Sequence, residues 1–352
     1  MRYKNLIFIS SGYKGGSTKF IEQHISFQKK NNIYLIDENP QNTYKYFKYL
    51  NYINTIKLPI HSKKIFSYKK LKLFFYYHNF DRAVIFLSNF SIFIYFFFLF
   101  RKLQKKNKIK IVLTIHSGIF QKNIKSIIAC LLFSIIYKKL DLLFFGSYSA
   151  KNWWKKYFPW MNIKNNNVIY NGVDIPKNVI KEKSSSLRIS FVGRLESENN
   201  PFLFIKVAEF FLKKYSNNKY VFNIFGDGSL KTEIQKILLP NTIFFGWKTR
   251  EFIYKNSDLI LITSPVNNFP YIALEAKSFG VPVISCSQGD VSKIINNNYD
   301  GFILKNESIL DFVDKILLIE KKYSFFSANS LKNRYNFTTK DSCKKFWDLI
   351  NQ

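Results

Sequence analysis

Short apolar runs alternate with helix-length segments along the first half of the chain. The clearest strands are expected at residues 5–10, 32–37, 83–88, 109–115 and 142–147. Helices are expected near residues 17–30, 66–79, 91–107 and 122–140. This alternation is typical of a parallel sheet covered by helices. A further strand is expected over 166–170, and the polar segment 175–186 then indicates a linker.

The second half repeats the alternation. Strands are expected at 187–192, 220–225, 242–245, 258–263 and 282–286, with helices beginning near 201, 229, 249 and 270. Residues 338–350 have helical spacing and are expected to cross back to the first domain. The pattern predicts an α/β protein of two Rossmann-like parallel-sheet domains. The expected boundaries are 1–175, 176–335 and a final helix at 336–352.

Composition fits this organisation and a cytoplasmic location. The 352 residues are 47% hydrophobic, enough for two domains. The apolar segment 83–100 approaches the length of a membrane span, but Ser88 and Asn89 divide it, so we expect strand, turn and helix. Three cysteines lie far apart and are expected to be free thiols, without a disulfide framework or a zinc site. The apolar stretch 6–9 is too short for a signal peptide.

The positive charge is large and uneven. The formal net charge is +31, and residues 1–176 hold 29 Lys and Arg against 6 Asp and Glu. Such a field attracts nucleic acid, an anionic membrane or an acidic polymer. No nucleic-acid-binding motif accompanies it. We therefore expect no nucleic-acid partner, and a first domain that rests peripherally on the anionic inner face of the cytoplasmic membrane.

Several strand ends in the second half carry residues suited to a phosphate ligand. Arg194 follows Gly193 at the end of a predicted strand, and its guanidinium can donate two parallel hydrogen bonds to a diphosphate. Gly226 and Gly246 follow the next two strands, where glycine lets a ligand approach the backbone. Each signal alone is weak, because a charged or glycine-containing turn at a strand end is common.

The segment 264–280 is the most informative. Pro270 is suited to the first turn of a helix, whose free N–H groups can hold a phosphate. Glu275 falls about one and a half turns later, where a carboxylate can accept hydrogen bonds from a ribose diol. By itself, this glutamate would more often be a solvated surface residue.

Together these segments resemble a known family. VIYNGVDIP, FVGRLESENN, FNIFGDGSLKTEI, FFGW and NNFPYIALEAKSFGVPVIS occur in the order found in GT-B retaining glycosyltransferases. This large family includes sucrose synthase, bacterial mannosyltransferases and lipopolysaccharide core glycosyltransferases. The resemblance is strong over 141–305 and weak before it. It implies that the two Rossmann-like domains face each other across a cleft. It also implies metal-independent transfer of a hexose-type sugar from a UDP- or GDP-linked donor to a lipid-linked, lipopolysaccharide or capsule saccharide acceptor, with no cofactor.

The resemblance also implies roles for individual residues. Arg194 would pair with the donor diphosphate, Glu275 with the ribose, and His116 would lie beside the donor sugar. These three are the expected catalytic residues. The expected donor-binding residues are Gly15, Gly16, Arg194, Asn199, Gly226, Gly246, Trp247, Asn267, Phe269, Pro270, Tyr271, Ile272 and Glu275.

Two positions depart from the family pattern. The family usually has Lys where this chain has Asn199, and Glu where it has Asn267. A phosphate cation and a sugar-binding carboxylate are thus replaced by amides, which leaves a non-catalytic nucleotide-sugar or polysaccharide-binding protein as the alternative. A nucleotide-sugar epimerase on the same fold is a further possibility.

Overall fold

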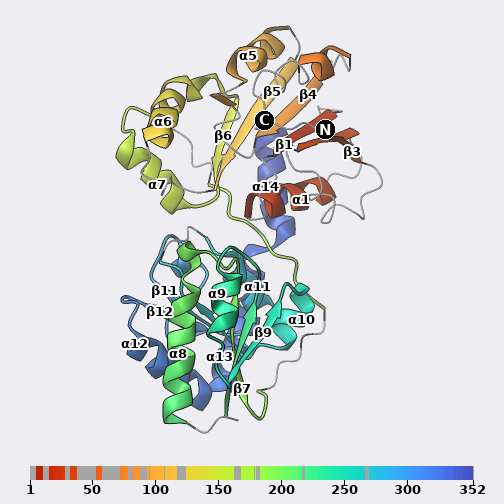
Figure 1. Cartoon of the computed structure of the whole chain (residues 1–352). Coiled ribbons are helices and arrows are strands. Elements are labelled where there is room, and N and C mark those ends of the chain that lie inside the picture. Colours follow the sequence, from red (N-terminus) through yellow and green to blue (C-terminus); the bar gives the residue numbers. More distant parts are fainter. Residues whose placement is uncertain are drawn as a thin grey trace. The chain divides into compact units, whose positions relative to one another are not determined.

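The computed structural model describes residues 5–10, 16–27, 32–37, 53–57, 72–77, 82–87, 93–94, 96–106, 108–116, 124–161, 168–177, 179, 183–215, 219–265 and 269–351. The chain divides into two compact units. The first unit comprises residues 1–171 together with 340–352, and the second comprises 172–339. Each unit is built on its own parallel sheet (Figure 1).

The described part of the first unit contains a six-stranded sheet in the order β3-β2-β1-β4-β5-β6. Its strands are β1 (Asn5–Ser10), β2 (Asn32–Asp37), β3 (Ile53–Lys57), β4 (Arg82–Leu87), β5 (Lys108–Ile115) and β6 (Leu142–Phe145). Every pairing is parallel. The helices are α1 (Gly16–Phe27), α5 (Phe97–Lys106), α6 (Ile124–Ile136), α7 (Tyr148–Tyr157) and α14 (Thr339–Asn351, of which residues 340–351 belong to this unit).

Alternate residues of these strands enter two separate cores. Leu6 and Phe8 of β1 pack with α1 and α14, whereas Ile7 packs with α5, α6 and α7 on the other face. Successive strand side chains point to opposite faces, so near-continuous apolar runs mark strands that are covered on both sides. Helix α14 contributes Phe346 and Trp347, so the end of the chain completes the core of the first unit.

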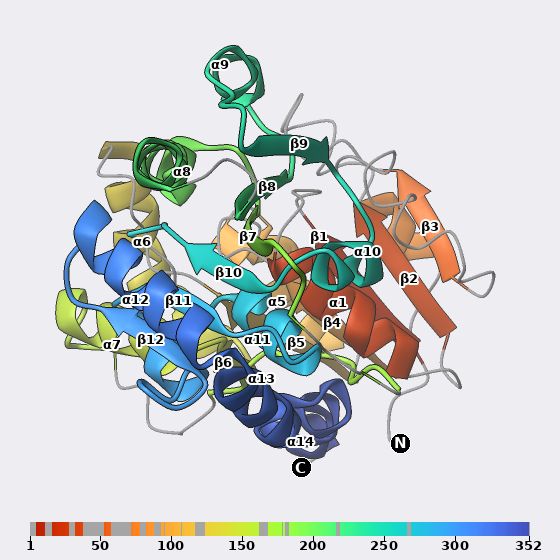
Figure 2. The same ribbon diagram turned by 90° about the horizontal axis from the view of Figure 1, so that it is seen from below.

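The second unit contains, over its described residues, a six-stranded parallel sheet in the order β12-β11-β10-β7-β8-β9 (Figure 2). Its strands are β7 (Leu187–Val192), β8 (Tyr220–Phe225), β9 (Thr242–Gly246), β10 (Leu259–Ile262), β11 (Val283–Cys286) and β12 (Gly301–Leu304). Its helices are α8 (Pro201–Lys214), α9 (Lys231–Lys236), α10 (Arg250–Lys255), α11 (Tyr271–Ser278), α12 (Ile309–Lys321) and α13 (Tyr323–Lys332). Both sheets have the doubly wound order 3-2-1-4-5-6, with a reversal between their first and fourth strands.

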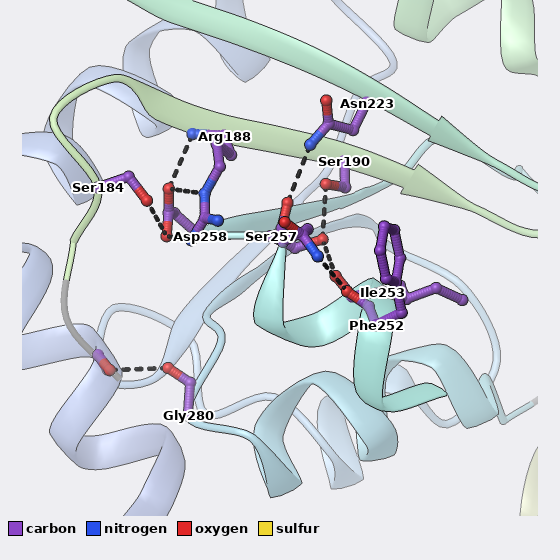
Figure 3. A network of polar contacts seen from close by, with 11 residues as sticks. Ser184, Arg188, Ser190, Asn223, Phe252, Ile253, Ser257, Asp258 and Gly280 are labelled. Carbon is purple, nitrogen blue, oxygen red and sulfur yellow. Dashed lines mark hydrogen bonds and ion pairs between the residues drawn. The ribbon is translucent and has the colours of Figure 1, made fainter. Parts of the chain in front are cut away.

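A polar network joins the amino ends of the central strands in the second unit (Figure 3). Arg188 donates to Asp258 from Nε at 3.0 Å and from Nη2 at 2.8 Å, and its backbone N–H donates to the same carboxylate at 2.9 Å. Ser257 donates to Ser190 at 2.7 Å. The buried Asp258 carboxylate is therefore fully engaged, which fixes β10 beside β7 at the sheet end opposite to the loops described below.

The two-domain fold class predicted from the sequence is confirmed, but some elements were not predicted. The expected strand at 166–170 is wrong as stated, since over its described part only Val168 forms a bridge, with Phe145. Strands β3 and β12 were not predicted: polar residues interrupt the apolar pattern of β3 at 54, 55 and 57, and β12 begins with Gly301 directly after the polar segment 296–300. Within the segment 83–100, the described residues include most of β4 and the beginning of α5, as expected, whereas the expected turn at 88–89 lies outside the described residues. No helix in the described part of the chain is long and apolar enough to cross a bilayer.

Candidate functional site

Four loops follow the carboxyl ends of β7, β8, β9 and β10 in the second unit. In an open α/β sheet, ligands bind outside the carboxyl ends of the strands, at the point where the strand order reverses. Here that point lies between β7 and β10. The loops after these two strands are joined by hydrogen bonds, because Thr263 donates to the carbonyl of Asn199 at 3.0 Å and Ser264 to that of Glu198 at 2.8 Å.

Arg194 lies in the loop after β7 with about half of its side chain exposed, at 52%. Its Nη2 donates to Oε1 of Glu198, which is 54% exposed. Asn199 donates from Nδ2 to the backbone carbonyl of Arg194 at 2.8 Å. The amide that occupies the family's lysine position therefore braces the arginine loop, and the guanidinium has an acidic partner that a ligand phosphate would have to replace.

Close backbone approaches explain the glycines at these strand ends. Gly226 has φ +151°, and a Cβ there would lie 1.8 Å from the carbonyl oxygen of Gly193. Gly193 donates its N–H to Phe225 at 2.9 Å, and Gly226 donates to Gly246 at 2.9 Å. Only a residue without Cβ fits between these loops. The sequence therefore places the backbone of three consecutive strand ends in one tight layer.

Glu196 fixes the loop after β8. Its carboxylate accepts from the hydroxyl of Ser229 at 2.6 Å and from the Ser229 backbone N–H at 3.0 Å. The side-chain and backbone hydrogen bonds from Ser229, with a smaller contribution from Arg194, hold the pKa of Glu196 below its usual value. Glu196 is thus a structural brace between the Arg194 loop and the Gly226 loop.

Helix α11 places Glu275 beside a buried tyrosine. Pro270 is the N-cap of this helix, and Phe269 just before it is buried against Phe337, with ring centroids 5.2 Å apart. Glu275 is half-buried, and its Oε2 accepts a hydrogen bond from Tyr254 at 3.0 Å. Burial raises the pKa of Tyr254, which keeps the hydroxyl protonated and able to donate. The tyrosine therefore sets the direction of one carboxylate oxygen.

The loop after β9 carries exposed aromatic and cationic groups. Trp247 is 62% exposed, and Lys248 lies over the Phe252 ring with its Nζ 5.5 Å from the ring centroid. Gly246 has φ +67°, in the left-handed region that favours glycine. Tyr271 and Ile272 form the first turn of α11 and are partly buried.

The remaining predicted site residues fall in other places. Asn267 and Gly15 lie outside the described residues, and Gly16 is the first residue of α1. His116 follows β5 in the first unit, and burial lowers its pKa to about 4, so it is neutral at pH 7. Its Nδ1 lies 2.7 Å from the position that a Cβ on Gly146 would take, which explains that glycine.

The structure adds three residues that were not predicted: Glu196, Glu198 and Tyr254. The spacing of four between Arg194 and Glu198 is visible in the sequence and is typical of a local ion pair. The Tyr254 contact joins residues 21 positions apart on two helices, so no local pattern reveals it. Among the described residues, no three His, Cys, Asp or Glu side chains gather in a way that could hold a metal ion.

Comparisons with known proteins point to one family. Residues 173–336 match the family model described as Glycosyl transferases group 1. An Escherichia coli UDP-Gal:alpha-D-GlcNAc-diphosphoundecaprenol alpha-1,3-galactosyltransferase is 28% identical over 183 residues, which cover 46% of this chain and 47% of that protein. A Salmonella typhimurium lipopolysaccharide 1,6-galactosyltransferase is 28% identical over 175 residues, 44% of this chain and 47% of that protein.

The fold likeness extends over the whole chain. The structure of Anabaena HepE in complex with UDP and glucose has a TM-score of 0.77, covering 99% of this chain and 100% of that one at 14% identity. This likeness shows the GT-B fold. In sequence, the chain matches about half of the length of the curated relatives named above.

Proposed function

We propose that this chain transfers a hexose-type sugar with retention of configuration, since residues 173–336 match the model of group 1 glycosyl transferases. The donor is a nucleotide-diphosphate sugar, UDP- or GDP-linked. The acceptor is a lipid-linked saccharide or a growing lipopolysaccharide or capsule chain, reached from an anionic membrane surface. The galactosyltransferase relatives named above support a UDP-linked donor and a lipid-linked or lipopolysaccharide acceptor.

One observation carries the proposal: the Arg194 loop is tied to the loop after β10 at the reversal of strand order. This position suits a ligand that spans the carboxyl edge of the sheet. Arg194 would bind the diphosphate, and the N-terminal backbone of α11 would bind the distal phosphate and sugar. Glu275, held by Tyr254, would accept hydrogen bonds from the ribose.

The proposed reaction depends more on stabilising the leaving diphosphate than on a strong general base. The bond between the anomeric carbon and the diphosphate breaks, and a bond from that carbon to the acceptor oxygen forms on the same face. The proton of the acceptor hydroxyl passes to the leaving phosphate oxygen. Negative charge develops on the diphosphate as the oxocarbenium-like state forms, so Arg194 and the backbone amides would supply most of the acceleration. The neutral His116 is proposed as a hydrogen-bonding residue beside the donor sugar.

The test combines turnover with donor binding. UDP- and GDP-hexoses labelled in the sugar would be supplied with a polyprenyl-diphosphate-linked saccharide, and NMR of the product would report the anomeric configuration. Arg194→Ala should weaken donor binding by roughly 1.5 to 3 kcal/mol, the cost of losing a charged hydrogen bond. The control is Lys213→Ala, an exposed cation on α8 whose partner is Glu209. Donor affinity that is equal in Arg194→Ala and in the control would refute the site.

The alternative is a nucleotide-sugar-binding protein without transfer activity, motivated by Asn199 and Asn267. Binding of a nucleotide sugar by the wild-type chain, with no turnover for any acceptor class, would favour this alternative. If the wild-type chain neither binds nor turns over any nucleotide sugar, both the transferase and the binding-protein functions are contradicted.

A further inference from the structure

Helix α6 is apolar on the side that faces solvent as well as on the side that faces the core. Cys130 and Phe133 are buried in the first unit. Six aliphatic side chains are exposed by at least 42%: Ile124, Ile127, Ile128, Leu131, Leu132 and Ile135. Their spacing follows i, i+3, i+4, i+7, i+8 and i+11, which places them on one continuous face of the helix. We refer to these six residues as the α6 stripe.

A surface helix of a globular protein normally turns a polar face to water. An exposed row of six large aliphatic residues instead marks a surface that is covered by a partner or a membrane. Ile124 and Ile135, near the two ends of the stripe, are 76% and 70% exposed, so the stripe is open along its length. Packing among the described residues of the first unit therefore leaves this face of α6 exposed.

Aromatic side chains from α7 and the residues after it extend this surface. Trp160 is 54% exposed, and its Nε1 donates to Ser134 of α6 at 3.1 Å. Tyr157 is 53% exposed. Figures 1 and 2 both show α6 and α7 on the same side of the first unit. Amphipathic aromatic rings are enriched at the boundary between membrane and water, so their position at the margin of an aliphatic face favours a bilayer.

The charges around the stripe are almost all positive. Residues 124–161 contain six lysines and one acidic residue, Asp141. Lys138 and Lys139 follow α6 directly, and Lys155 and Lys156 end α7; all four are exposed. The Asp141 carboxylate is engaged, since it accepts from the Ile111 backbone and from Gln104, both at 2.7 Å. An anionic surface complements this pattern.

We propose that α6 is a membrane-docking helix, which lies along an anionic bilayer with the α6 stripe among the acyl chains and the flanking lysines at the phosphate headgroups. A second copy of the chain is a less suitable partner for the α6 stripe than an anionic bilayer. A symmetric dimer through α6 would bring two sets of exposed lysines together, and their repulsion would oppose the apolar contact. The inference deepens the proposed function, because a lipid-linked acceptor requires an enzyme at the membrane. Docking itself is measurable without donor or acceptor.

Vesicle cosedimentation of the full chain tests the inference. The vesicles contain equal parts of phosphatidylglycerol and phosphatidylcholine, with pure phosphatidylcholine as the comparison. The double variant Ile128→Glu with Ile135→Glu should weaken binding to the anionic vesicles by about tenfold or more, because it places two carboxylates in the inserted face. The matched control is Leu310→Glu, at a leucine that is 60% exposed on α12 of the second unit. The control should bind as the wild type does.

The salt dependence of vesicle binding distinguishes insertion of the α6 stripe from electrostatic attraction to the headgroups. The double variant Lys155→Gln with Lys156→Gln should reduce vesicle binding at low salt. The binding that persists at high salt should remain, since screening weakens only the electrostatic contribution. Equal binding of the wild type and the Ile128→Glu, Ile135→Glu variant, at low and at high salt, would overturn the proposal. So would analytical sedimentation showing a wild-type dimer that this variant converts to a monomer, because the face would then be a subunit interface.

Quenching by brominated acyl chains gives a readout that does not depend on the folding of the charged variant. Trp160 borders the α6 stripe, so vesicles that carry brominated lipids should quench part of the tryptophan emission of the wild-type chain. Trp160→Phe should remove a large share of that quenching and leave vesicle binding almost unchanged. Quenching that is absent in the wild type, or unaltered by Trp160→Phe, would contradict insertion of this surface. Failure of sugar transfer alone would bear on the proposed function and not on docking.

Discussion

Arg194 and Glu198, four residues apart in the loop after β7, form an exposed ion pair at the edge of the sheet where the donor diphosphate is proposed to bind. The pair gives the guanidinium a carboxylate partner in the position that a phosphate would take. A donor must therefore displace Glu198, and the repulsion between this carboxylate and the diphosphate opposes binding. The loss of the family's lysine at Asn199 makes this local balance of charge more important.

Glu198→Gln should tighten donor binding by up to about fivefold, because an exposed ion pair is worth less than about 1 kcal/mol. The gain should shrink as salt is added, since both the pair and the repulsion are screened. Titration calorimetry with the nucleotide sugar provides the measurement. Glu209→Gln is the control, because Glu209 forms a similar exposed pair with Lys213 on α8. Weaker donor binding in Glu198→Gln would show that the carboxylate assists the donor site.

Tyr254→Phe should weaken donor binding by about fivefold, corresponding to roughly 1 kcal/mol for the lost hydrogen bond to Glu275. A donor analogue that lacks both ribose hydroxyls should be insensitive to the substitution, because it makes no contact with the carboxylate. The control is Tyr220→Phe, since Tyr220 donates to Glu320 at 2.6 Å at the other end of the sheet. Equal effects on the donor and on the analogue would contradict the assignment of Glu275 to the ribose.

Gly226→Ala should lower the thermal stability of the second unit severely, by roughly 3 kcal/mol or more. The new methyl group would lie 1.8 Å from the Gly193 carbonyl, so two strand ends would have to separate. Gly246→Ala is the comparison: it has φ +67° and its Cβ would meet only the Phe244 ring at 3.7 Å. Backbone strain alone should cost about 1 kcal/mol there. Similar melting temperatures for both variants would refute the close backbone layer.

The stability of the first unit should fall as the pH drops below about 6.5. His24 is fully buried, and neither of its ring nitrogens has a hydrogen-bond partner among the described residues. Burial, with a smaller contribution from His116, lowers its pKa from 6.5 to about 3. The folded state therefore binds fewer protons than the unfolded state between these values, so stability is fully present above pH 6.5 and is lost toward pH 3.

The expected slope from His24 alone approaches 1.4 kcal/mol per pH unit once the unfolded imidazole is protonated. His24→Phe keeps an aromatic ring among Phe20, Phe346 and Trp347 and removes the titrating group. Between pH 8 and pH 4, the melting temperature of the wild type should fall more steeply than that of the variant, because only the wild type loses stability through this imidazole. Parallel curves over the whole range would exclude His24 as the source of acid sensitivity.

The sequence alone determined the central strands and the order of the candidate-site loops that follow them. Strands such as β1 and β10 are buried on both faces, so their apolar runs are nearly continuous and stand out from their surroundings. Arg194, Gly226 and Glu275 were predicted as site residues because they follow the strands in a fixed order, and the carboxyl ends of parallel strands lie at one edge of a sheet.

Only the tertiary structure decided which surfaces and side chains meet. Helix α6 is apolar around most of its circumference, so periodicity could not tell its core face from its exposed face; burial of Phe133 against Trp154 settles which is which. The hydrogen bond from Tyr254 to Glu275 likewise depends on the packing of α10 and α11, because neither residue has a local pattern that favours the other. Local sequence encodes the elements, whereas contacts between elements depend on how several distant segments share one core.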